Sequence, residues 1–95
     1  MKEICGVYID NNNIVIQTGE EKDFMQRIEC MKDSIMAQSS KQHKKVPEDV
    51  MTGMERFYSW KSQHYDPNAR TNIPQEIQNE LLPALYYCEK EQIDF

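Results

Sequence analysis

A run of large apolar and aromatic side chains between Val46 and Tyr65 constrains the fold of this 95-residue chain more than any other feature. The run reads VPEDVMTGMERFYSWKSQHY and carries methionine, phenylalanine, tyrosine and tryptophan at a density found nowhere else in the sequence. A domain of this size buries roughly 60–70% of the surface that its unfolded chain exposes, so its large apolar residues are needed inside. The run is therefore either most of the core or a surface that contacts another molecule.

Two short apolar segments at the N-terminus predict a β-hairpin over about residues 3–18. Ile4–Ile9 and Ile14–Thr18 are rich in β-branched residues, and the polar segment Asp10–Asn13 between them suits a tight turn. A two-stranded hairpin alone is only marginally stable in water. We therefore expect it to pack on helices or to pair with further strands, including those of a second copy of the chain.

Helical periodicity then predicts three α-helices over about residues 19–38, 47–65 and 73–92. Apolar residues recur every three or four positions, namely Phe24, Ile28, Met31 and Ile35 in the first helix, Val50, Met54 and Phe57 in the second, and Ile77, Leu81, Leu85 and Cys88 in the third. Residues 39–45 are polar and predict an exposed linker. Pro83 lacks a backbone N–H, so we expect the last helix to be kinked or broken near residues 79–82.

The expected fold is therefore one α+β domain over residues 1–95, a hairpin followed by three helices. Its predicted core consists of Ile4, Val7, Ile9, Ile14, Ile16, Phe24, Ile28, Met31, Ile35, Val50, Met54, Phe57, Ile77, Leu81, Leu85 and Cys88. Gly53 stands inside the second helix, where glycine costs about 1 kcal/mol relative to alanine. Its presence there indicates a close approach of another backbone.

The charge pattern limits the classes of partner. The net charge is −5, which disfavours general binding to nucleic acids or anionic membranes. Residues 41–70 are the exception, with six basic side chains against four acidic ones. No apolar run is long enough to span a membrane. A local anion-binding site in the middle of the chain is compatible with this distribution.

The cysteine and histidine residues show no motif of catalysis, metal binding or secretion. Cys5, Cys30 and Cys88 are odd in number and far apart, and neither they nor His43 and His64 show the spacing of a metal site. Met1 leads directly into charged residues rather than into the apolar core of a signal peptide. We therefore expect a non-enzymatic cytoplasmic protein with reduced thiols and no cofactor or metal.

The apolar groups of the second helix are too broadly distributed to point into one narrow seam. Such residues combine large contact area with adaptability, so those not needed in the core are candidates for binding a partner protein. The predicted partner-binding residues are Met51, Arg56, Tyr58, Trp60, Lys61 and Tyr65. We expect a regulatory or inhibitory module that binds another protein, with homodimer formation as a further form of association.

Two alternatives use charge instead. In the first, a small nucleic-acid- or nucleotide-binding protein would use an anion site formed by Lys41, His43, Lys44, Lys45 and Arg70. In the second, acidic side chains would imitate the phosphates of a nucleic acid, which requires a stronger negative field than a net charge of −5 provides. The Lys-, Asn-, Gln- and Met-rich composition is compatible with a phage or mobile element of a low-GC bacterium, whose accessory proteins commonly block a larger host machine.

Overall fold

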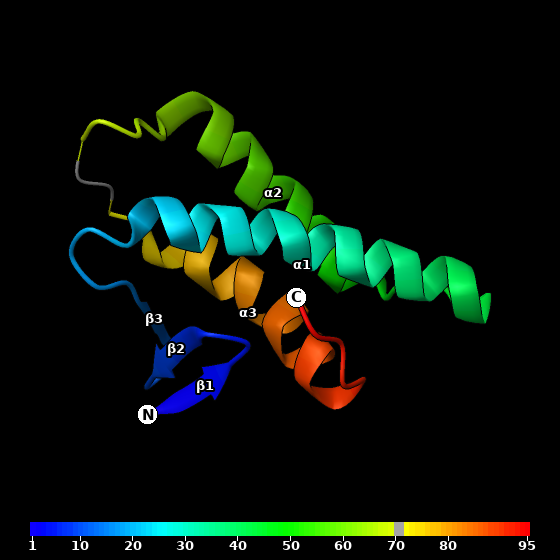
Figure 1. The fold of residues 1–95 in the computed structure, drawn as a ribbon. Coiled ribbons are helices and arrows are strands. Elements are labelled where there is room, and N and C mark those ends of the chain that lie inside the picture. The colour runs from blue at the N-terminus through cyan, green and yellow to red at the C-terminus, as the bar shows by residue number, and fades with distance from the viewer. Residues whose placement is uncertain (70–71) are drawn as a thin grey trace.

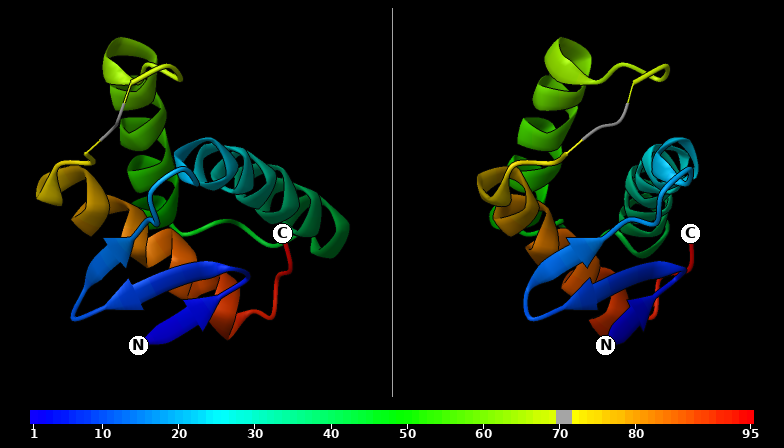
Figure 2. Two further views of the ribbon diagram at one scale, coloured as in Figure 1. Left: turned by 60° about the vertical axis from the view of Figure 1, so that its left-hand side comes forward. Right: turned by 90° about the vertical axis from the view of Figure 1, so that its left-hand side faces the viewer.

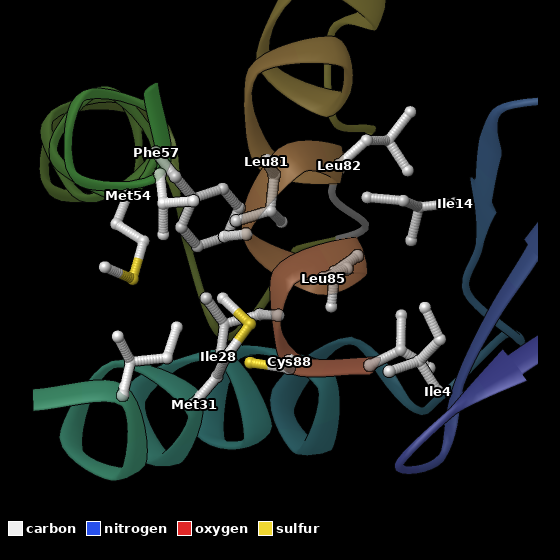
Figure 3. Close-up of a cluster of buried hydrophobic side chains, with 14 of the residues drawn as sticks. Ile4, Ile14, Ile28, Met31, Met54, Phe57, Leu81, Leu82, Leu85 and Cys88 are labelled. Atoms are coloured by element: carbon white, nitrogen blue, oxygen red, sulfur yellow. The ribbon is translucent and has the colours of Figure 1, made fainter. Parts of the chain in front are cut away.

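The computed structural model describes residues 1–69 and 72–95 and confirms an α+β fold, shown in Figure 1. An antiparallel sheet of β1 (Lys2–Ile4), β2 (Val7–Asp10) and β3 (Asn13–Val15) comes first. It is followed by α1 (Glu21–Gln42), α2 (Glu48–His64) and α3 (Gln75–Lys90). α3 lies between α2 and the sheet, and α1 runs beside all three, as Figures 2 and 3 show.

Two tight turns build the sheet, where the sequence predicted one. Cys5 and Gly6 join β1 to β2, and Asn11 and Asn12 join β2 to β3, all with positive φ. A two-residue hairpin turn of type I′ requires positive φ at both central positions, which asparagine and glycine tolerate well. The predicted single strand Ile4–Ile9 is thus wrong, because Cys5-Gly6 folds it back on itself and adds a third strand. The tight turn predicted at Asp10–Asn13 is confirmed as the β2–β3 connection.

One face of the sheet is buried and the other is open to solvent. Ile4 pairs with Val7, and Ile9 pairs with Ile14, so these four side chains share the buried face. α3 contacts both outer strands, β1 and β3. The sheet therefore obtains from α3 the support that a small sheet of this length needs.

α1 is longer than the sequence predicted. The helix continues to Gln42 and ends at His43, which adopts the left-handed conformation with φ 53°. Residues 39–42 are thus helical rather than part of a linker. This last part of α1 is held by the segment after α3, since Gln38 Nε2 donates to the Glu91 carbonyl at 3.5 Å and Lys44 pairs with the Glu91 carboxylate at 2.8 Å.

α2 and α3 approach each other most closely at Gly53. A Cβ atom built on Gly53 would lie 1.9 Å from the carbonyl oxygen of Glu80, which is far inside any real contact. The oxygen therefore occupies the place of a side chain, in the arrangement typical of a Cα–H···O contact between helices. The close backbone approach that the sequence indicated at Gly53 is confirmed.

α3 runs as one continuous helix across Pro83, so the predicted break is absent, and the structure does not show the predicted kink. Proline leaves the carbonyl of Asn79 without its helical donor. The residues around it, Leu81, Leu82, Ala84 and Leu85, are all buried. Burial on both sides of Pro83 favours a continuous helix despite the missing hydrogen bond.

The core forms where the three helices and the sheet meet, as Figure 3 shows. Phe57 of α2 lies at its centre and meets Phe24 of α1 edge to face, with ring centroids 6.2 Å apart. Of the predicted core residues, only Ile16 and Ile77 are partly rather than fully buried. Six further residues are buried that the sequence did not predict: Met25, Val46, Ile73, Leu82, Ala84 and Ile93.

Replacement of Gly53 by alanine tests the α2–α3 contact. In an isolated helix Gly→Ala stabilises by about 1 kcal/mol. Here the added methyl group would collide with the Glu80 carbonyl and force the two helices apart. We expect a net loss of about 2 kcal/mol or more in the free energy of unfolding, measured by urea denaturation. Thr52→Ala, at the exposed neighbouring position, is the control and should not destabilise the protein, because alanine exceeds threonine in helix propensity by up to about 0.7 kcal/mol. A G53A protein more stable than the wild type would contradict the contact.

Candidate functional site

The structure distributes the predicted partner-binding residues over two flanks of α2. The centre of the helix faces the core through Val50, Met54 and Phe57. Met51, Tyr58 and Tyr65 follow one another at intervals of seven residues, so they share one flank. Arg56 and Trp60 are four residues apart and share the opposite flank. All of these except Arg56 are partly buried, so they do not form one continuous exposed surface.

The flank with Met51 and Tyr58 lies against α1. The Tyr58 hydroxyl donates to the Ile28 carbonyl of α1 at 3.0 Å, and the Lys32 ammonium lies 4.9 Å from the centre of its ring. Lys61 pairs with Glu29 of α1. Burial, aided by the negative charge of Glu29, raises the pKa of the Tyr58 hydroxyl above its ordinary value. Tyr58 therefore joins the two helices as a neutral hydrogen-bond donor.

The opposite flank lies against α3. The Arg56 guanidinium pairs with the Glu80 carboxylate at 2.9 Å, beside the contact made by Gly53. Trp60 packs against the core, with its ring 6.0 Å from Phe57 and 6.3 Å from His64. Arg56 and Trp60 thus have partners within the chain.

A groove with a mainly apolar lining runs between α1 and α2. Its volume is about 420 Å³. The lining residues are Lys32 and Met36 of α1 and Met51, Met54, Glu55 and Tyr58 of α2. Met36 is 43% exposed, which is high for so large an apolar side chain. We call these six residues the methionine groove. It leaves the end of the Met36 side chain open to solvent, and its lining includes one basic residue, Lys32, and one acidic residue, Glu55.

The sequence predicted only part of this groove. It predicted Met51 and Tyr58 as binding residues, but it did not predict Lys32, Met36, Met54 or Glu55. A signal was present in α1, where Met36 widens the apolar stripe beyond Ile35. Pairing that signal with Met51 needed the relative placement of the two helices, which periodicity within each helix does not give.

The basic residues after α1 do not form one free cluster. The Lys44 ammonium donates to the Glu91 carboxylate at 2.8 Å. This hydrogen bond raises the pKa of Lys44 and lowers that of Glu91. Lys41 lies in the last turn of α1, and His43 and Lys45 are exposed near it, while Arg70 lies outside the described residues. The charge of Lys44 is therefore balanced within the chain.

The three cysteines are free thiols at different depths. Cys30 is exposed, Cys5 is partly buried beside the carbonyl of Ile93, and Cys88 is fully buried. Burial, with a smaller effect of Cys5, raises the pKa of the Cys88 thiol from 9.0 to about 12. Within residues 1–69 and 72–95, no three His, Cys, Asp or Glu side chains lie together as metal ligands would.

Comparisons with protein-family models, curated proteins and solved structures gave no match for this chain. In the described part of the chain, no helix has both the length and the apolarity required to cross a bilayer.

Removal of the Tyr58 hydroxyl tests how α1 and α2 are joined. Tyr58→Phe keeps the ring but leaves the Ile28 carbonyl without this donor. We expect the free energy of unfolding to fall by about 1 kcal/mol, measured by urea denaturation. Tyr8→Phe, which removes an exposed hydroxyl, is the matched control and should have almost no effect. Equal effects of the two substitutions would contradict the interhelical role of Tyr58.

Thiol reactivity tests the depth of the cysteines. A thiol-specific reagent at pH 8 should modify Cys30 rapidly and Cys88 only when the protein unfolds, because Cys88 is buried and protonated. The unfolded chain loses this thiol proton at lower pH than the folded chain. The contribution of Cys88 to stability should therefore decline as the pH rises from 9.0 towards 12. Rapid modification of Cys88 in the folded protein, identified by mass spectrometry, would contradict this placement.

Proposed function

We propose that this protein is a non-enzymatic module that binds another protein through the methionine groove and thereby regulates or inhibits it. The observation that carries the proposal is the exposed position of Met36 beside Met51 and Tyr58, in a groove of about 420 Å³ between two helices. Methionine is flexible and polarisable, so it adapts to the apolar side chains of a partner.

The shape and chemistry of the groove favour a protein segment as its occupant. A groove between two helices suits an amphipathic helix, which inserts apolar residues spaced three or four positions apart. Lys32 and Glu55 contribute one charge of each sign, and these would pair with an acidic and a basic residue of the partner segment. The inserted apolar side chains would supply affinity, and the charges would set the orientation.

A binding module of this kind acts by covering a surface of its target. A regulatory or inhibitory role of this kind needs only a binding surface, which a chain of 95 residues can provide. We further propose the accessory class indicated by composition, in which a small acidic protein blocks a larger host machine. The nucleic-acid alternative is less favoured, since Glu91 balances the charge of Lys44.

Site-specific photo-cross-linking in the protein's own host tests this function. We would place a photoreactive amino acid at position 36, inside the groove, and in a second strain at position 37. Ala37 is exposed and lies about 100° further round α1, so it is the matched control. After irradiation we expect a discrete protein adduct from position 36 and none from position 37.

The comparison of positions 36 and 37 distinguishes binding in the groove from non-specific cross-linking along α1. Thermal unfolding of both proteins must first give similar midpoints, which shows that the fold is kept. Adducts of equal amount from positions 36 and 37 would contradict the proposal, and so would an adduct with nucleic acid alone.

A further inference from the structure

The two edges of the sheet differ in whether they are covered. On the β3 side, the Ile14 N–H donates to the Gln78 side-chain oxygen at 2.8 Å, and Gln75 Nε2 donates to the Asn12 carbonyl at 3.5 Å. Both glutamines belong to the start of α3. The β3 edge is therefore occupied by side chains of the same chain, which is one way that proteins prevent unwanted strand pairing.

The backbone of Glu3 faces the other edge. Since the Ile14 N–H points away from β2, the opposed residues Ile9 and Ile14 do not exchange backbone hydrogen bonds. The N–H and C=O of Ile9 must then point towards β1, where they face the backbone of Lys2. The alternation along an antiparallel ladder turns the N–H and C=O of the next residue, Glu3, outward. None of the turn, loop and cap backbone hydrogen bonds of the described residues involves Glu3.

The solvent face beside this edge has a distinct charge. Glu3, Tyr8 and Val15 stand opposite one another across the three strands. A cleft of about 290 Å³ separates this row from the start of α1, where Glu20, Asp23 and Arg27 line it. The cleft thus has three carboxylates and one guanidinium, and that guanidinium donates to the Cys5 carbonyl at 3.0 Å.

We propose that β1 pairs with an extended segment of another protein that carries a lysine or arginine opposite Glu3. The outward N–H and C=O of Glu3 would form two backbone hydrogen bonds with the added strand. The side chain opposite Glu3 stands on the same face of the sheet, so its cation would meet the Glu3 carboxylate and the acidic cleft. Its aliphatic part would lie beside the Glu3 side chain, which separates it from Tyr8 on β2.

A second copy of this chain is a poor occupant of the same edge. β1 has three residues, and Glu3 is the central one. Antiparallel pairing of two β1 strands through their outward groups would place Glu3 directly opposite Glu3 of the second copy. Like charges in directly opposed positions destabilise a sheet. Charge complementarity therefore favours a basic segment of a different protein.

This surface goes beyond the proposed function and is independent of the methionine groove. Arg27 and Asp23 lie on the flank of α1 that borders the sheet, whereas Lys32 and Met36 lie on the flank that borders α2. A result that rules out binding at one of these surfaces therefore leaves the proposal for the other surface unaffected.

A peptide titration followed by NMR tests the proposal. The probes are the extended pentapeptide Ac-TVKVT-NH2 and its acidic match Ac-TVEVT-NH2, added to the full ¹⁵N-labelled chain. We expect the lysine peptide to shift the amide signals of Glu3 and Tyr8 and to slow hydrogen exchange at the Glu3 amide. The acidic peptide should bind at least about fivefold more weakly, because it places like charges opposite each other.

Variants assign the effect to Glu3. Glu3→Lys should weaken binding of the lysine peptide at least about fivefold, while Asp33→Lys, an equal charge change at an exposed site on α1, should leave it unchanged. The proposal is overturned if neither peptide shifts β1, if both bind equally, or if E3K has no effect. It is also overturned if the wild-type protein alone sediments as a dimer with a protected Glu3 amide, since the occupant would then be a second copy.

Discussion

The close contact between Gly53 and the Glu80 carbonyl is the constraint on which the rest of the structure depends. It sets the distance between α2 and α3, and that distance brings Phe57 onto Leu81, as Figure 3 shows. Pro83 lines the same depression as Gly53 and Glu80. The residues least favourable inside helices, glycine and proline, thus lie together where two helices meet, and burial of the surrounding leucines offsets their local cost.

The same contact explains why α2 contributes side chains both to the core and to the methionine groove. With α2 fixed against α3, its central face is used by Val50, Met54 and Phe57, and its second flank is left for α1. α1 closes this flank only in part, through Tyr58 and the Lys61–Glu29 pair. Met36 and Met51 stay at an incompletely filled junction, and this is the groove that we propose binds a partner protein.

The sequence predicted the elements well and their mutual placement poorly. Helical periodicity located the three helices and ten of their buried residues, because a buried stripe must repeat at the helical period, and the β-branched segments supplied four more buried residues in the sheet. It did not separate Ile4–Ile9 into two strands, since the Cys5-Gly6 turn depends on backbone angles in a segment whose side chains suit a strand. It also treated Met51, Arg56, Tyr58, Trp60, Lys61 and Tyr65 as one surface. Only the packing of α1 and α3 on opposite flanks of α2 divides them.

Native mass spectrometry of the untagged protein purified from its own host can show whether the methionine groove binds a partner, when wild type and Met36→Glu are compared under identical conditions. We predict that the wild-type chain retains one larger protein in a fixed ratio. The substitution places a charge in the methionine groove, so the same complex should be absent from the variant while its fold is kept. A wild-type chain that appears alone, or a variant that retains the same protein in the same amount, would contradict the account.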